Sequence, residues 1–138
     1  MVKYDIKYKD FNDMDRVEVA YFHLTEAEIV EMMYDKSTLL DQIEEITKNN
    51  DMDKIIKVIK NLILKAYGRK SEDGLYFVKV DEEGHKLANK FVQSGAYSAL
   101  FMELARDDQK SADFIKRVLP KELSDSAKKQ IEDAKESK

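Results

Sequence analysis

The chain has 138 residues, a length that is typical of one domain and sufficient to bury a hydrophobic core. Charged residues make up 38% of it, but 24 Lys and Arg against 28 Asp and Glu leave a formal net charge of -4, which argues against nucleic-acid binding driven mainly by electrostatics. The absence of Cys excludes disulfides and thiol nucleophiles, and no apolar run or leader is typical of a membrane span or a secretory signal. With four Gly and one Pro, the composition favours a soluble, intracellular and mostly helical domain.

The first 24 residues predict a β-hairpin. Apolar and charged residues alternate from Val2 to Phe11, and a stretch of turn-forming residues occupies positions 10–15. A second alternating run follows at Val17, Val19 and Tyr21. Because an isolated hairpin is only marginally stable in water, we expect it to pack on the rest of the chain or to gain strands from a partner.

Two helices are predicted next. Thr25 and Glu28 have the spacing of a capping box, in which each side chain bonds to the backbone N–H of the other residue at a helix start. Ile29, Met32 and Met33 give this helix an apolar side. A further helix is expected to begin at Ser37 or Thr38 and to end before residues 49–51.

The clearest predicted helix runs from Met52 to about Tyr67, since its apolar residues recur every three or four positions. Gly68 stands where a helix commonly ends. Three lysines of this segment repeat at a spacing of three, and they fit either the solvated side of an amphipathic helix or a basic stripe for a partner: Lys54, Lys57 and Lys60. We favour the solvated side.

The remaining segments are read in the same way. Residues 75–80 fit either a short strand or an extended loop, and Asp81 is expected to cap a helix that includes Leu87 and Phe91. A helix is predicted from Ala96, and another around Phe114 that ends at Pro120.

The elements together predict a mainly α fold, a helical domain of about five to seven helices with a small N-terminal β-hairpin. We expect a single domain over residues 1–138, with a hairpin at 1–24, a helical core at 25–120 and a helical or frayed tail at 121–138.

Catalytic and metal-binding patterns are hard to find. The two histidines, His23 and His85, fall on separate elements without the spacing of a ligand pair, so surface or structural roles are favoured for both. The segment from Asp10 to Tyr21 begins like a calcium loop but lacks the glycine at position six and the glutamate at position twelve. No phosphate-binding glycine loop or Gly-x-Ser-x-Gly elbow occurs. We therefore expect no catalytic residues, no metal and no cofactor.

Candidate partner contacts are apolar side chains on two of the predicted helices. The predicted helix that contains Tyr97, Phe101 and Met102 has apolar residues around most of its circumference. A second apolar patch is formed by Met32 and Met33. Methionine adapts its shape and is common on surfaces that bind varied apolar helices. The alternative is that these side chains lie in the core, which helical spacing alone favours.

Three motifs in order resemble the tail assembly chaperones of long-tailed phages and prophages of Gram-positive bacteria. The first is the "aromatic-x-Leu-Thr-x-Ala-Glu" pattern in Tyr21–Ile29. The others are Leu62–Gly68 followed by Lys70–Gly74 and Phe77, and Ala96–Ala105 followed by Ala112, Phe114–Ile115 and Val118–Pro120. Together they extend over most of the chain, from about Tyr21 to Pro120.

The resemblance implies a non-enzymatic late protein that binds the tape measure protein in the host bacterial cytoplasm, keeps it soluble and recruits tail tube subunits. It also implies a protein that is absent from the finished virion, with no membrane or nucleic-acid partner. The predicted hairpin supplies a strand edge that we expect to pair with a neighbouring copy or with a tube subunit.

Two other classes of function remain open on the sequence alone. A small DNA-associated phage regulator, built from helices and a β wing, is the first alternative, and retention on DNA at moderate salt would distinguish it. A hydrolase that uses an Asp/Glu pair is the second, and the lack of a plausible His, Cys or Ser constellation makes it the weaker one.

Overall fold

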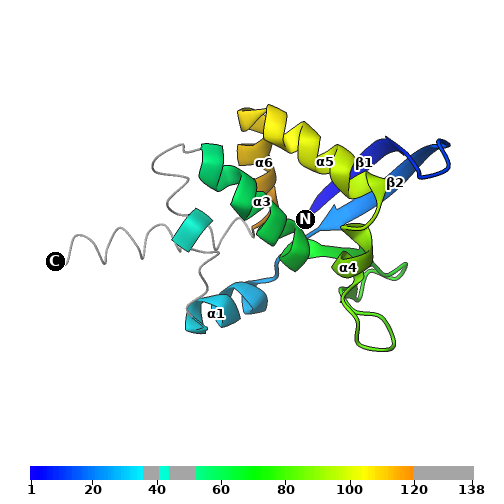
Figure 1. The fold of residues 1–138 in the computed structure, drawn as a ribbon. Helices are drawn as coiled ribbons and strands as arrows, with labels where there is room; N and C mark the ends of the chain where they lie inside the picture. Colours follow the sequence, from blue (N-terminus) through cyan, green and yellow to red (C-terminus); the bar gives the residue numbers. More distant parts are fainter. Residues whose placement is uncertain (36–40, 44–51, 120–138) are drawn as a thin grey trace.

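The computed structural model describes residues 1–35, 41–43 and 52–119 (Figure 1). In chain order, the described strands and helices are β1 (Val2–Lys9), β2 (Asp15–Phe22), α1 (Glu26–Tyr34), α3 (Met52–Ala66), β3 (Tyr67–Lys70), β4 (Phe77–Val78), α4 (Leu87–Phe91), α5 (Gly95–Arg106) and α6 (Asp108–Val118). The helix expected from Ser37 or Thr38 lies mostly outside the described residues, as does the tail at 121–138.

The four strands form one antiparallel sheet in the order β1-β2-β3-β4. The predicted hairpin is confirmed, since β1 and β2 pair over their full lengths from Val2 opposite Phe22 to Lys9 opposite Asp15. β3 pairs with the end of β2, where Phe22 lies opposite Tyr67, and β4 pairs with β3. β1 is thus an edge strand of this sheet, and its pairing with a second molecule stays a prediction.

The mainly α fold class predicted from the sequence is wrong, because this sheet makes the fold mixed α/β. The helix that was expected to reach Tyr67 and stop at Gly68 ends at Ala66, and the chain continues directly as β3. β3 has only four residues, which is too short for an alternating pattern to stand out in a sequence. β4 has two residues and lies within the segment 75–80, which was read as a short strand or an extended loop. β3 pairs with β2, which lies more than 40 residues earlier, and β4 pairs with β3.

The hydrophobic core lies between one face of the sheet and helices α3 to α6 (Figure 1). Phe22 is at its centre, with ring centroids 5.3 Å from Phe114, 5.9 Å from Phe91 and 5.8 Å from Tyr67. The three- and four-residue spacing in α3 is confirmed as a buried stripe made of Ile55, Ile59, Leu62, Ile63 and Ala66. α5 packs along β1, and α6 packs on both α5 and α3.

The opposite face of the sheet is open. In β2, the side chains that face the core are those of Ala20 and Phe22, which are buried. The intervening residues point to the other face, where Val17 is 61% exposed and Val19 is 47% exposed. The alternation that predicted the strand is therefore real, but the valines in it are on the outer face.

Several predicted helix boundaries depend on capping side chains. The capping box is confirmed: the Thr25 hydroxyl accepts from the Glu28 N–H, and the Glu28 carboxylate accepts from the Thr25 N–H. Asp107 caps α6 by accepting from the backbone N–H groups of the second and third residues after it. Asp81 was expected to cap α4, but it does not. Its carboxylate instead accepts hydrogen bonds from the backbone N–H groups of Glu83 and His85, in a turn before that helix.

None of the helices in the described ranges is long and apolar enough to cross a membrane.

Candidate interaction surfaces

The two histidines do not form a reactive cluster. His23 lies beside the Phe77 ring, and burial holds the pKa of its imidazole below the ordinary value. His85 is exposed in the turn before α4, with its Nδ1 3.6 Å from Asp81 Oδ2 and 3.5 Å from Glu83 Oε2. In the part of the chain that the structure describes, no group of three or more His, Cys, Asp or Glu residues could hold a metal ion.

The α5 candidates lie at the margin of the core. Tyr97 and Phe101 are half-buried, one helical turn apart, and their ring centroids are 5.8 Å apart. The Tyr97 ring also meets the Phe91 ring edge-on at 6.1 Å. Met102 is 41% exposed and is the most accessible of the three. α5 thus presents a small apolar margin made of these three side chains.

The α1 candidates are separated by the helix. Met32 is buried in the core with only 7% of its surface exposed, whereas Met33 is 45% exposed. Val30 and Tyr34 are also exposed and share the outer side of α1 with Met33, since Val30 lies three residues before Met33 and four before Tyr34. Sequence reasoning missed Val30 and Tyr34, although the concentration of apolar residues at positions 29–34 was a visible signal. In Figure 1, α1 and α5 lie at opposite ends of the molecule, so the two candidate patches are not one surface.

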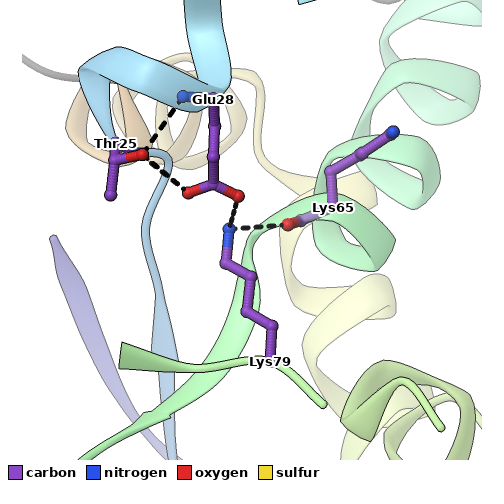
Figure 2. A network of polar contacts seen from close by, with 4 residues as sticks. All are labelled: Thr25, Glu28, Lys65 and Lys79. Carbon is purple, nitrogen blue, oxygen red and sulfur yellow. Dashed lines mark hydrogen bonds and ion pairs between the residues drawn. The ribbon is translucent and has the colours of Figure 1, made fainter. Parts of the chain in front are cut away.

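α1 is held in place by an ion pair that no sequence pattern indicated. The Lys79 ammonium lies 2.6 Å from Glu28 Oε2 and donates a second hydrogen bond of 2.9 Å to the backbone carbonyl of Lys65 (Figure 2). The same Glu28 carboxylate completes the capping box with Thr25. This network joins the first turn of α1 to the last turn of α3 and to the segment after β4, so it fixes where the outer side of α1 points.

The pKa of Glu28 reflects this network. Burial by itself raises the pKa, but the hydrogen bonds from Lys79 and from the Thr25 N–H outweigh it and lower the pKa below the ordinary glutamate value. Burial also lowers the pKa of Lys79, although the Glu28 carboxylate acts to raise it. Burial therefore disfavours the charged form of Lys79 that the ion pair needs. Of these two groups only Glu28 changes its charge in the acid range, so the shift of its pKa sets what this ion pair contributes to the pH dependence of stability there.

We expect Glu28→Gln to reduce the free energy of unfolding by about 0.5–1 kcal/mol at neutral pH, a value discounted for partial exposure of the pair. Gln can keep the capping hydrogen bond through its Oε1, but its amide NH2 takes the place of Oε2, so the change removes the charge and the hydrogen bond from Lys79. Because the folded-state pKa is depressed, the stabilisation is complete above the ordinary glutamate pKa of about 4.3 and is lost as the pH falls through the folded value. Urea unfolding from pH 7 to pH 3 should show the wild type and the variant converging. Glu26→Gln, at an exposed position in the same turn, is the matched control, and an equal loss there would contradict the assignment.

Accessible apolar side chains thus remain on α1 and α5 at Val30, Met33, Tyr34 and Met102. A family model described as phage tail assembly chaperone matches residues 1–138, so the chain belongs to the phage tail assembly chaperone family. This confirms the family that the three sequence motifs indicated. The comparison with curated proteins gave no significant match, and neither did the comparison with solved structures.

Proposed function

We propose that this protein binds the tape measure protein in the cytoplasm of the host bacterium, keeps it soluble and recruits tail tube subunits during tail assembly. The observation that carries the proposal is the family match, which extends over the whole chain. The role requires binding and no chemical step, so we propose no catalytic residue, cofactor, membrane or nucleic-acid partner.

The apolar patches support this role. A long helical client with apolar stripes needs adaptable apolar contacts, and Met33 and Met102 supply flexible side chains at exposed positions. The charged remainder of the surface would keep a complex of the two proteins in solution. We propose that Met33 with Val30 and Tyr34 forms one contact, and that Met102 with the margin of Tyr97 and Phe101 forms the other.

Co-expression tests the client. When this chain is produced with the tape measure protein of the same phage, we expect the tape measure protein to move from the pellet to the soluble fraction and to co-purify with the chaperone. A tape measure protein that stays insoluble would contradict the proposal. Retention of the chaperone on DNA at moderate salt would instead favour a DNA-associated regulator.

Point variants test the surfaces. We expect Met33→Glu and Met102→Glu each to weaken binding to a soluble helical segment of the tape measure protein by about tenfold or more, because burying a methionine is worth about 1.5–3 kcal/mol. Leu75→Glu, at a more exposed apolar position in the loop between β3 and β4, is the matched control and should bind like the wild type. Titration calorimetry gives the dissociation constants, and an unchanged constant for both methionine variants would exclude these patches.

A further inference from the structure

The loop between β3 and β4 presents two large apolar side chains to water. Leu75 is 73% exposed and Tyr76 is 66% exposed, and they are the last two residues before β4. In Figure 1 this loop and the turn before α4 extend beyond α4, on the side away from α5 and at a distance from α1. The two side chains therefore lie apart from both helices that carry the proposed tape measure contacts.

Hydrogen bonds within this loop hold it in one shape. The Ser71 N–H donates to the Tyr76 carbonyl at 2.9 Å, and the Tyr76 N–H donates to the Ser71 hydroxyl at 3.0 Å. The Asp73 carboxylate accepts from the Ser71 hydroxyl at 2.6 Å and from the Leu75 N–H at 3.1 Å. Gly74 adopts a positive φ of 77° in the turn. Because the backbone is ordered in advance, a partner that binds Leu75 and Tyr76 loses little free energy in fixing it.

A shallow hollow of about 330 Å³ lies beside this loop. Its apolar lining comes from Val78, Val80 and Leu87, and Val80 is 49% exposed. Basic residues of β3 and acidic residues of the turn before α4 also line it: Arg69, Lys70, Asp81 and Glu82. The hollow therefore fits a partner's apolar side chain that has one acidic and one basic neighbour.

The turn that borders the hollow is fixed as well. The Asp81 N–H donates to the His85 carbonyl and the Leu87 N–H donates to the Lys79 carbonyl, both at 2.9 Å. Val80 also forms an antiparallel bridge with Lys86. The protruding pair and the hollow beside it are thus both preformed, and we call them together the loop surface.

A preformed shape suits a folded partner better than a long helical one. Met33 and Met102, in the proposed tape measure contacts, are flexible side chains that can follow varied apolar stripes. Leu75 and Tyr76 stand on fixed backbone instead, and tyrosine is among the side chains that most often dominate binding between proteins. A folded subunit presents the same relief in every copy, so a fixed protrusion and hollow can match it each time.

We propose that the loop surface binds the folded tail tube subunit, with Leu75 and Tyr76 as the apolar anchors and an apolar side chain of the subunit in the hollow. This inference rests on the proposed function, in which one protein holds the tape measure protein and recruits tube subunits. Holding both at once requires two separate surfaces, and the loop surface is separate from α1 and α5 (Figure 1).

Binding to the two partners in parallel tests the assignment. The probes are the tail tube protein of the same phage, at a concentration at which it stays monomeric, and the soluble tape measure segment. Leu75→Glu and Tyr76→Ala should each raise the dissociation constant for the tube protein by about tenfold or more and leave the constant for the tape measure segment unchanged. Met33→Glu and Met102→Glu should show the reverse pattern. Biolayer interferometry with the full chain immobilised gives both constants.

Matched variants separate the anchors from general apolar contact and from misfolding. Phe11→Ala/Met14→Ala removes two exposed apolar side chains from the β1–β2 turn and should bind the tube protein like the wild type. Ser71→Ala keeps both anchors but removes hydrogen bonds that fix the loop, so we expect binding to weaken by about threefold to tenfold. Ser71→Thr keeps a hydroxyl and should restore it. Thermal unfolding should be unchanged in Leu75→Glu and Tyr76→Ala, since both side chains are exposed.

Three results would overturn the proposal and leave the proposed function in place. The first is tube binding that Leu75→Glu and Tyr76→Ala leave unchanged. The second is an equal loss of tube binding in Phe11→Ala/Met14→Ala. The third is loss of tape measure binding in Leu75→Glu, which would assign the loop surface to the tape measure protein. A failure of the function itself looks different, because the wild type would then bind no tube protein, with or without the tape measure segment.

Discussion

Phe22→Ala should lower the free energy of unfolding by about 3–5 kcal/mol, the range for removing a fully buried phenylalanine from a core. The Phe22 side chain has no exposed surface and joins β2 to β1, β3, α4 and α6 through the rings around it. Its truncation removes contacts to all of these elements at once. Because single domains are typically stable by only about 5–15 kcal/mol, the loss is a large fraction of the total.

Urea denaturation followed by far-ultraviolet circular dichroism measures this effect. Phe11→Ala is the matched control, because Phe11 lies in the β1–β2 turn with 85% of its side chain exposed, and its loss should change stability by less than about 0.5 kcal/mol. Equal effects at the two positions would mean that Phe22 is not at the centre of the core. A destabilised Phe22 variant should also fail in the co-expression test, since both proposed patches depend on helices that this core holds.

Gly68→Ala should cost about 1–3 kcal/mol, the usual penalty for adding a methyl group to a filled space. The new Cβ atom would meet the Phe77 ring and would lie 2.7 Å from the backbone oxygen of Val78. Backbone cannot move aside as a side chain can, so β4 must shift away from β3. Gly68 does not adopt a positive φ, and crowding alone therefore accounts for the loss.

A double-mutant cycle separates crowding from backbone strain. Phe77→Ala should recover part of the cost of Gly68→Ala, because the two sites are in contact and their effects are not additive. Gly74, with a φ of 77° and no atom within 4 Å of its Cβ position, is the comparison site. Gly74→Ala should lower the free energy of unfolding through backbone strain, and adding Phe77→Ala should recover none of that loss. Additive effects at Gly68 would contradict the packing of Phe77 over β3.

Local patterns predicted the elements whose signals lie within about fifteen residues. The hairpin follows from alternation, the capping box from Thr25 and Glu28, and α3 from the spacing of its apolar residues. α6 follows from the apolar residues around Phe114 and from Pro120 after them. Each of these signals acts through bonds or contacts between near neighbours, which is why the order of residues alone reveals it.

The candidate surfaces were only partly predictable. The spacing of Met32 and Met33 indicated an apolar side on α1, but two adjacent residues on a helix point about 100° apart, and only the packing decides which one is buried. For β2, the alternation of residues did not reveal which face would meet the core. The Glu28–Lys79 pair joins residues 51 positions apart, and among 52 charged residues no spacing rule would select it.

By itself, the sequence determined the family, the hairpin and the amphipathic helices, because motifs, turn residues and hydrophobic periodicity are local properties of a chain. The tertiary structure alone decided that Tyr67–Lys70 is a strand, that Lys79 holds α1, and that Val17 and Val19 face outward. These outcomes come from pairing and packing between segments that are distant in the chain. Their free energies compete with local preferences only once the segments have met, so a short piece such as Tyr67–Lys70 takes its conformation from its neighbours in space.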